Sequence, residues 1–283
     1  MSATKQVVQK ATTEIAVADD MFEDAGAGLE NTTSEDFAIP FISPIQALSP
    51  QRNKQKSEYI EGAEEGMIFN SVNGELFNGE EGIMVIPCSY TKNVIEWRVR
   101  ETEGGGLIDI HPAGYRAPNR TERAPNGTER DDRGRDRVLN TDGKMTSSQL
   151  VPTASFFCLL IDATGAFKNV VINMSSTQMK KSKRWMTMIA ENMAKHPKTG
   201  QMVTLPMFSN VYHLSLVPES NDKGSWFGWA VAKAKRVDLN DPAEAAMYRA
   251  AKAFHGSVKS GEAKAQYEGE ATVVDSDDEG TEY

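Results

Sequence analysis

The chain has 283 residues, a formal net charge of −9 at pH 7 and a hydrophobic content of 39%, which is enough to form a core. Its longest apolar run, residues 156–161, is far too short to span a bilayer, and its first twenty residues lack the apolar segment of a signal peptide. Cys88 and Cys158 lie in apolar runs, which favours reduced, buried thiols over a disulfide. We therefore expect a soluble cytoplasmic protein that makes no membrane contact.

The charge is distributed unevenly along the chain. Residues 1–37 carry −6 and residues 262–283 carry −7, which leaves +4 on the body between them. The acidic ends lack sustained apolar periodicity, and their like charges repel, as in disordered segments. We predict a disordered acidic arm over residues 1–37, one β-rich domain over residues 38–260 and a disordered acidic tail over residues 261–283.

The first part of the body predicts short β-strands. Pro40, Pro44 and Pro50 exclude a helix over residues 36–50 and favour an extended edge segment. Short runs of β-forming residues follow, separated by glycine-containing turns: GMIFNSV, GIMVIPCSY, NVIEWRVR and GLIDIHP. Strands spaced in this way are typical of a meander, a barrel or a sandwich.

Residues 112–149 interrupt this pattern. The heptad APNRTER at residues 117–123 is followed at once by the near-copy APNGTER at residues 124–130. A packed segment rarely accepts a duplicated heptad without repacking, and this one is rich in arginine, so we predict an exposed loop over residues 112–149. Two interpretations stay open: an arginine-rich flap that closes on a polyanion, and a solvated insertion with no role.

The second part of the body predicts two further strand pairs and two helices. The strand pairs are ASFFCLLID with AFKNVVINM, and MVTLPMFSNVYHLSLVP with SWFGWAVAKAKRV. Ser175 and Ser176 offer an N-cap for a helix that ends before Pro197, and Asp241-Pro242 opens a last helix. The predicted class is α+β: a mainly β body with one embedded and one C-terminal helix.

Residues suited to catalysis are sparse. The four histidines are scattered, and no His/Cys/Asp spacing matches a metal site. The segment GSVKSGEAK lacks the Gly-Lys-Ser/Thr ending of a phosphate loop and follows a predicted helix rather than a strand. We expect no enzymatic activity, no catalytic residue, no metal and no cofactor.

Four cations crowd the first half of the embedded helix: Lys180, Lys181, Lys183 and Arg184. The helix macrodipole already places positive charge at that end, so like charges there are unfavourable unless an anion binds. Phosphate groups would gain from both the side chains and the helix terminus. The alternative is an ordinary solvated helix face.

Aromatic rings alternate with cations in three stretches of the body. The candidate stacking and phosphate-binding residues in these stretches are Trp97, Arg98, Arg100, Trp185, Trp226, Phe227, Trp229, Lys233, Lys235 and Arg236. Bases of single-stranded nucleic acid stack on rings while the backbone follows positive charge, so this pattern favours a single-strand binding groove. Taken singly, each ring is more often a core residue.

The chain ends in an acidic tail with a terminal ring: Asp275, Asp277, Asp278, Glu279, Glu282 and Tyr283. A flexible anionic segment tethered near a basic groove competes there with nucleic acid because its effective concentration is high. We expect DNA to displace the tail, which then docks on other proteins. The alternative is a tail that only improves solubility.

With this tail, and with the blocks PFISPIQALSP, GIMVIPCSY…EWRVR, STQMKKSKRW and GSWFGWAV, the chain resembles the single-stranded-DNA-binding proteins of tailed bacteriophages. The resemblance implies an OB-like β-barrel, cooperative coating of single strands, and tail contacts with a polymerase or helicase. We therefore expect a single-stranded-DNA-binding protein of phage replication or recombination. A phage structural or assembly protein and a strand-annealing recombination protein are the alternatives, and the sequence leaves a homo-oligomer open.

Overall fold

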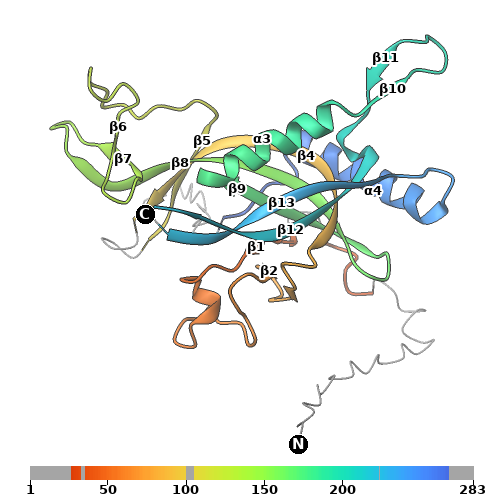
Figure 1. The fold of residues 1–283 in the computed structure, drawn as a ribbon, viewed down its shortest axis with the longest axis horizontal. Coiled ribbons are helices and arrows are strands. Elements are labelled where there is room, and N and C mark those ends of the chain that lie inside the picture. The colour runs from red at the N-terminus through yellow and green to blue at the C-terminus, as the bar shows by residue number, and fades with distance from the viewer. Residues whose placement is uncertain (1–26, 33–35, 100–104, 223, 268–283) are drawn as a thin grey trace, which may run out of the picture. The chain divides into compact units, whose positions relative to one another are not determined.

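The computed structural model describes residues 27–32, 36–99, 105–222 and 224–267 (Figure 1). The chain divides into two units, Met1–Phe37 and Ala38–Tyr283, and every described strand and α-helix belongs to the second. Most of the predicted acidic arm and most of the predicted acidic tail lie outside the described residues, so their disorder stays a prediction.

The main sheet is built on a ribbon of two long strands. β4 (Ile83–Arg98) and β8 (Met145–Ile161) pair antiparallel from Met84↔Ile161 to Arg98↔Ser148. These strands are much longer than the five or six residues of a typical strand, so different partners pair with the two ends of the ribbon.

Six further strands complete the eight-stranded sheet. At the end that holds Ile83, β12 pairs with β4, β13 pairs with β12, and β9 pairs with β8; this is the core end. At the other end, β5 pairs with β4 and the β6–β7 hairpin pairs with β8; this is the hairpin end. The bounds are β5 (Gly106–Pro112), β6 (Thr128–Arg130), β7 (Asp136–Leu139), β9 (Phe167–Ser175), β12 (Asn210–Asn221) and β13 (Gly224–Arg236).

Two small sheets and two α-helices complete the described fold. The small sheets are β1 (Ile42–Pro44), β2 (Ile68–Asn70) and β3 (Leu76–Phe77), and the hairpin of β10 (Met193–Lys195) and β11 (Met202–Thr204). The helices are α3 (Met179–Ala190) and α4 (Pro242–Ser260), with short 3-10 turns at Pro50–Arg52, Ser176–Gln178 and Met207–Ser209. Neither α-helix is apolar enough over a sufficient length to cross a bilayer.

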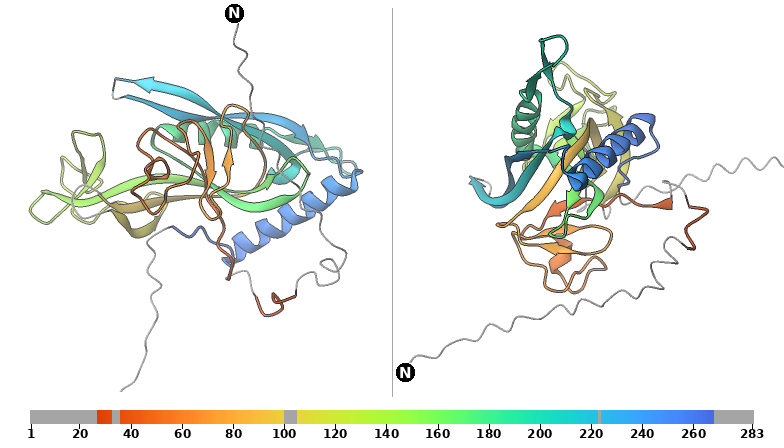
Figure 2. Two further views of the ribbon diagram at one scale, coloured as in Figure 1. Left: turned by 90° about the horizontal axis from the view of Figure 1, so that it is seen from below. Right: turned by 90° about the vertical axis from the view of Figure 1, so that its right-hand side faces the viewer.

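The helices cover opposite faces of the sheet (Figure 2). α4 begins where the Asp241 carboxylate accepts the Ala243 and Glu244 backbone N–H groups, and it ends at Gly261 in the left-handed conformation. It buries Met247, Ala251 and Phe254 on one face, called here the α4 face. The opposite face, against which α3 packs, is called the α3 face.

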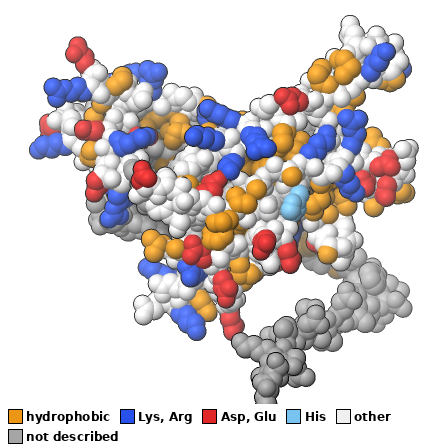
Figure 3. Space-filling view, viewed as in Figure 1, with side chains coloured by type: hydrophobic (Ala, Val, Ile, Leu, Met, Phe, Trp, Pro, Cys, Tyr) orange, Lys and Arg blue, Asp and Glu red, His pale blue; other side chains and the backbone are white. Residues whose placement is uncertain are grey.

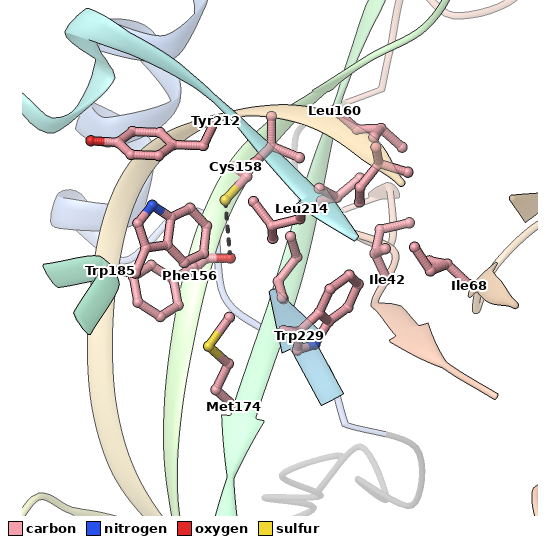
Figure 4. Close-up of a cluster of buried hydrophobic side chains, with 14 of the residues drawn as sticks. Ile42, Ile68, Phe156, Cys158, Leu160, Met174, Trp185, Tyr212, Leu214 and Trp229 are labelled. Atoms are coloured by element: carbon pink, nitrogen blue, oxygen red, sulfur yellow. Dashed lines mark hydrogen bonds between the residues drawn. The ribbon is translucent and has the colours of Figure 1, made fainter. Parts of the chain in front are cut away.

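The core on the α3 face is centred on aromatic rings (Figure 4). Trp185 of α3 is fully buried and stacks on Phe156 of β8 with the ring centroids 4.1 Å apart. Tyr212 of β12 meets the same indole edge-on at 5.7 Å. Aromatic contacts of this kind add about 0.5–1.5 kcal/mol beyond the area they bury, so Trp185 fixes the helix on the sheet.

The predicted α+β class is confirmed, but the described strands do not close into the expected OB-like barrel. At the core end the ladder stops at β9 and β13, and the β1–β3 sheet spans the gap. Phe41 bridges Val171 of β9, while the Gln46 amide bonds the backbone N–H and carbonyl of Phe227 in β13 at 2.9 and 2.8 Å. Gln178, just before α3, accepts the Trp229 backbone N–H at 2.9 Å. Side-chain amides therefore occupy an edge that could otherwise pair with another chain.

Most of the predicted strands, the β12–β13 hairpin and the C-terminal helix are confirmed. The embedded helix was placed too long, because it ends at Ala190 and the chain continues into the β10–β11 hairpin. No serine side chain caps it. Just after the helix, the side-chain amide of Asn192 donates to Ser209 Oγ, and the backbone carbonyl of Asn192 accepts the Leu205 N–H. These bonds turn the chain away from the helix axis.

Two predicted boundaries need correction. Residues 112–149 are not one loop, since they contain β6, β7 and the first residues of β8. The predicted disordered tail begins too early, because Tyr267 is buried between Phe41 and Trp97, at ring distances of 5.1 and 5.9 Å. Its hydroxyl lies 3.3 Å from Ser155 Oγ. An aromatic anchor therefore holds the start of the acidic segment on the domain.

Replacing Trp185 with Ala should lower the free energy of unfolding by about 3–5 kcal/mol, because the void between Phe156 and Tyr212 cannot collapse fully. Thr187→Ala, on the exposed side of the same helix, should change it by less than about 0.5 kcal/mol. Urea unfolding followed by circular dichroism measures both. Equal stability of the two variants would contradict the anchoring role of Trp185.

Candidate nucleic-acid interface

α3 separates its charges from its apolar residues. Ser182, Trp185 and Ile189 are buried, whereas Lys180, Lys183 and Arg184 are exposed. Within the described part of the chain, none of these three cations forms an ion pair. Lys180 lies in the first turn of α3, where the macrodipole is positive, and Lys183 and Arg184 follow in the next turn, so the surface holds uncompensated positive charge.

Lys181, the fourth predicted cation, is held by a carboxylate. Glu219 at the end of β12 accepts from Lys181 Nζ at 2.6 Å, from Trp226 Nε1 at 2.9 Å and from Gln178 Nε2 at 3.1 Å. Glu219 passes over Gly228, where a Cβ would lie 2.3 Å from its Oε2 atom. The Glu219 cluster therefore joins β13 to the start of α3, an arrangement that the sequence did not predict.

Electrostatics favours the ionised form of Glu219. Desolvation alone would raise the pKa of this carboxyl, but the bonds from Lys181, Trp226 and Gln178 outweigh it and lower the pKa below its ordinary value of 4.5. The cluster is therefore fully formed at neutral pH.

Two cations of β13 converge on the other end of α3. Lys233 Nζ and Arg236 Nη2 each donate to Asn192 Oδ1 at 3.2 Å. They lie beside the negative end of the helix dipole, which stabilises them without a carboxylate. Lys235 does not join them, since it pairs with Glu244 of α4 at 2.6 Å.

Two of the predicted stacking rings are core residues. Trp185 is 0% and Trp229 is 1% exposed, so neither can receive a base, and the prediction that they stack on DNA is wrong. The alternation along β13 shows that two faces exist but not which one is inside. Phe227 shares the inward face and lies half-buried against Gly66, while Trp226 is half-buried on the other face beside the Glu219 cluster.

The stretch around Trp97 is divided between the faces of the sheet. Trp97 shares a side of the ribbon with Ile95 and meets Tyr267, which places it on the α4 face, away from α3. Arg98 is exposed on the opposite side of the strand. Arg100 lies outside the described residues, as do the six tail residues Asp275, Asp277, Asp278, Glu279, Glu282 and Tyr283.

The arginine-rich segment is stabilised by its own acids. Asp131 accepts from Arg135 Nε at 2.6 Å and from Arg137 Nη1 at 3.4 Å, and Arg130 pairs with Asp136 at 3.4 Å. Burial would raise the pKa of Asp131, but the arginines hold it at about 2. Several of the arginines predicted to form a flap are thus committed to the β6–β7 hairpin.

Sequence reasoning missed a cleft of about 290 Å³ at the hairpin end. Its lining combines two cations, one acid, polar side chains and an apolar floor: Lys92, Val94, Gly114, Tyr115, Arg116, Asn126, Thr128, Asp136, Leu150 and Pro152. They come from separate segments that only the β4–β8 register and the turn after β5 bring together. No contiguous motif could have identified them.

On the side of the molecule seen in Figure 3, Lys and Arg side chains gather over α3 and continue onto the lobe at the hairpin end. Among the described residues no group of His, Cys, Asp or Glu could hold a metal ion. Burial raises the pKa of Cys88 to about 12, and burial also raises the pKa of Cys158 well above its ordinary value, so neither buried thiol is a ready nucleophile. The chemically distinctive feature of the site is its gathering of Lys and Arg side chains.

A mainly β domain with a cationic helix on one face of its sheet is the class that the geometry defines. The chain belongs to the Pam3 phage gp34-like protein family, whose model matches residues 8–264. It is therefore a bacteriophage protein. No curated protein and no solved structure matches the chain.

Glu219→Gln should lower the free energy of unfolding by about 1–3 kcal/mol at neutral pH, because three charge-assisted bonds weaken. The folded pKa is below 4.5, so this stabilisation is present above pH 4.5 and is lost as the pH falls through the folded pKa. The difference between wild type and variant should therefore shrink below pH 4.5 in urea titrations. Glu191→Gln, at the exposed end of α3, is the control, and a difference independent of pH would contradict the account.

Proposed function

We propose that this phage protein binds single-stranded DNA and coats it during replication or recombination in the host cytoplasm. One observation carries the proposal: Lys180, Lys183 and Arg184 stand uncompensated on α3, on the face where Lys233 and Arg236 also lie. Cations left without carboxylates at a helix N-terminus favour a phosphate-bearing partner.

The mechanism is electrostatic first and aromatic second. The cations of α3 neutralise phosphates of the DNA strand and release the counterions condensed on them, and each neutralised phosphate of a single strand contributes about 0.7 to the salt slope of log K. Because Trp185 and Trp229 are buried, stacking is left to partly exposed rings such as Trp226. Binding of this kind tolerates any base sequence, which suits a coating protein.

The acidic tail is proposed as a competitor for the same cations and, once displaced, as a docking segment for a polymerase or helicase. Support comes from charge: residues 262–283 carry −7, while α3 displays unpaired cations. Tyr267 holds the start of the segment on the domain, which keeps the effective concentration of the tail high.

Changing Lys180, Lys183 and Arg184 together to Ala should weaken binding to fluorescein-labelled oligo-dT and lower the salt slope of log K by about 2, because three phosphate contacts are lost. The matched control removes three exposed cations, Arg249, Lys252 and Lys259, from α4 on the opposite face. Fluorescence anisotropy over a series of salt concentrations measures both.

The control triple variant should behave like the wild type. If the wild type fails to bind oligo-dT at every salt concentration of the series, the proposed function is refuted and the structural or assembly alternative is favoured. Acceleration of complementary-strand annealing, or binding of duplex as tight as that of single strands, would favour the strand-annealing alternative.

Deleting residues 273–283 should tighten oligo-dT binding, because the competing anions are removed. A full-length variant with Asn or Gln in place of the five tail acids should give a similar gain at low salt, and the gain should fade as salt rises. Unchanged or weaker affinity in both variants would remove the tail from the mechanism while leaving the role of α3 intact.

A further inference from the structure

The cleft at the hairpin end has the chemistry of a nucleotide site. We propose that it takes one nucleotide of the bound strand, with the base against Tyr115 and the apolar floor and the phosphate beside Lys92 and Arg116. This inference rests on the proposed function and adds to it a second region of DNA contact, at the hairpin end of the sheet.

The pairing register places the cleft on the α3 face. Lys92 pairs with Ala154, and Val94 pairs with Pro152, so these side chains lie on one side of the ribbon. Ala154 belongs to the same core as Phe156, on which Trp185 stacks. Pro152 lies four positions before Phe156 on β8, roughly 13 Å along the strand. A single DNA strand bound over α3 can therefore continue into the cleft without crossing an edge of the sheet.

The aromatic wall is held in place before any ligand binds. Tyr115 stacks on His111 with ring centroids 3.6 Å apart and planes 6° from parallel. His111 Nε2 in turn contacts Glu96 Oε2 at 2.8 Å, and Ser148 donates to the other oxygen of that carboxylate. Desolvation and the charges of Glu96 and Asp109 raise the pKa of Tyr115, so its phenol stays protonated as a donor. A preorganised ring loses little entropy when a base stacks on it.

The polar groups of the cleft match the two ends of a nucleotide. Lys92 and Arg116 form no ion pair within the described residues, whereas Asp136, the acid in the lining, pairs with Arg130 at 3.4 Å. A phosphate beside Lys92 and Arg116 therefore meets more positive than negative charge. The side-chain amide of Asn126 offers a donor and an acceptor to a base edge and makes no hydrogen bond within the same residues. A volume of about 290 Å³ lies at the low end for ligand sites, which suits a single unit of a polymer.

The duplicated heptad explains how Asn126 is placed there. In the first copy, Asn119 donates to the Leu139 carbonyl at 2.7 Å and holds the fold. In the second copy, the equivalent Asn126 lines the cleft. The copies differ only where Arg120 becomes Gly127, and a Cβ at Gly127, which has φ +72°, would lie 2.5 Å from the Ala117 carbonyl oxygen. Glycine therefore lets the second copy fold back on the first and form the wall.

The test compares Lys92→Ala/Arg116→Ala with Arg120→Ala/Lys144→Ala, a control that removes two exposed cations of the same lobe from outside the cleft. The cleft variant should bind oligo-dT roughly tenfold more weakly and lose about 1.4 from the salt slope, as two phosphate contacts require. The control should match the wild type. Tyr115→Leu should weaken binding by about fivefold or more with the slope unchanged, and Tyr115→Phe should keep most of the affinity.

A second probe separates this inference from the proposed function. Thymidine 5′-monophosphate should show saturation-transfer NMR signals with the wild type and with the triple α3 variant, and none with the cleft variant. Normal oligo-dT binding by both Lys92→Ala/Arg116→Ala and Tyr115→Leu would overturn the nucleotide site and leave the proposed function standing. Mononucleotide binding at the cleft without any oligo-dT binding would overturn the proposed function and the continuous path, and leave only a nucleotide pocket.

Discussion

The stacking of Trp185 on Phe156 is the contact on which the α3 face depends. The indole is wholly inside, so the helix has one rotational setting on the sheet, and that setting turns Lys180, Lys183 and Arg184 to solvent. The same setting brings Gln178 to the open edge of β13 and Lys181 to Glu219. Trp185, which the sequence suggested as a stacking residue, is thus the anchor that orients the proposed binding residues.

The protein treats its cations in two opposite ways. In the β6–β7 hairpin, Asp131 takes up Arg135 and Arg137, and the charge there stabilises a segment with little apolar surface. On α3, three neighbouring cations have no carboxylate in the described chain, although Glu219 is close enough to hold Lys181. Like charges crowded within five positions of one helix cost stability, so their retention on α3 is a physical sign of an anionic partner. The cleft at the hairpin end repeats this pattern with Lys92 and Arg116.

The sequence predicted an element correctly where a single segment contains all the residues that determine it. The Asp241-Pro242 start of α4 and the β12–β13 hairpin follow from capping and turn residues alone. The burial of Trp229 did not follow, because strand alternation shows which side chains share a face of β13, and only the packing of α3 and the β1–β3 sheet decides which face is inside. The burial of Trp185 depends on which side α3 turns toward the sheet, a side that it shares with Ser182 and Ile189. The cleft could not be predicted, since Lys92, Tyr115 and Asn126 meet only through the β4–β8 register and the fold-back of two heptads. The many arginines of residues 112–149 suggested a flap that closes on a polyanion as one interpretation, but Asp131 and Asp136 neutralise several of these arginines.

The most direct test of the account is lysine footprinting by limited acetylation and mass spectrometry, with and without saturating oligo-dT. The account predicts slower acetylation of Lys180 and Lys183 in the complex, and unchanged rates at Lys252 and Lys259 on the α4 face. Protection of the α4 lysines, with Lys180 and Lys183 reacting as in the free protein, would contradict it.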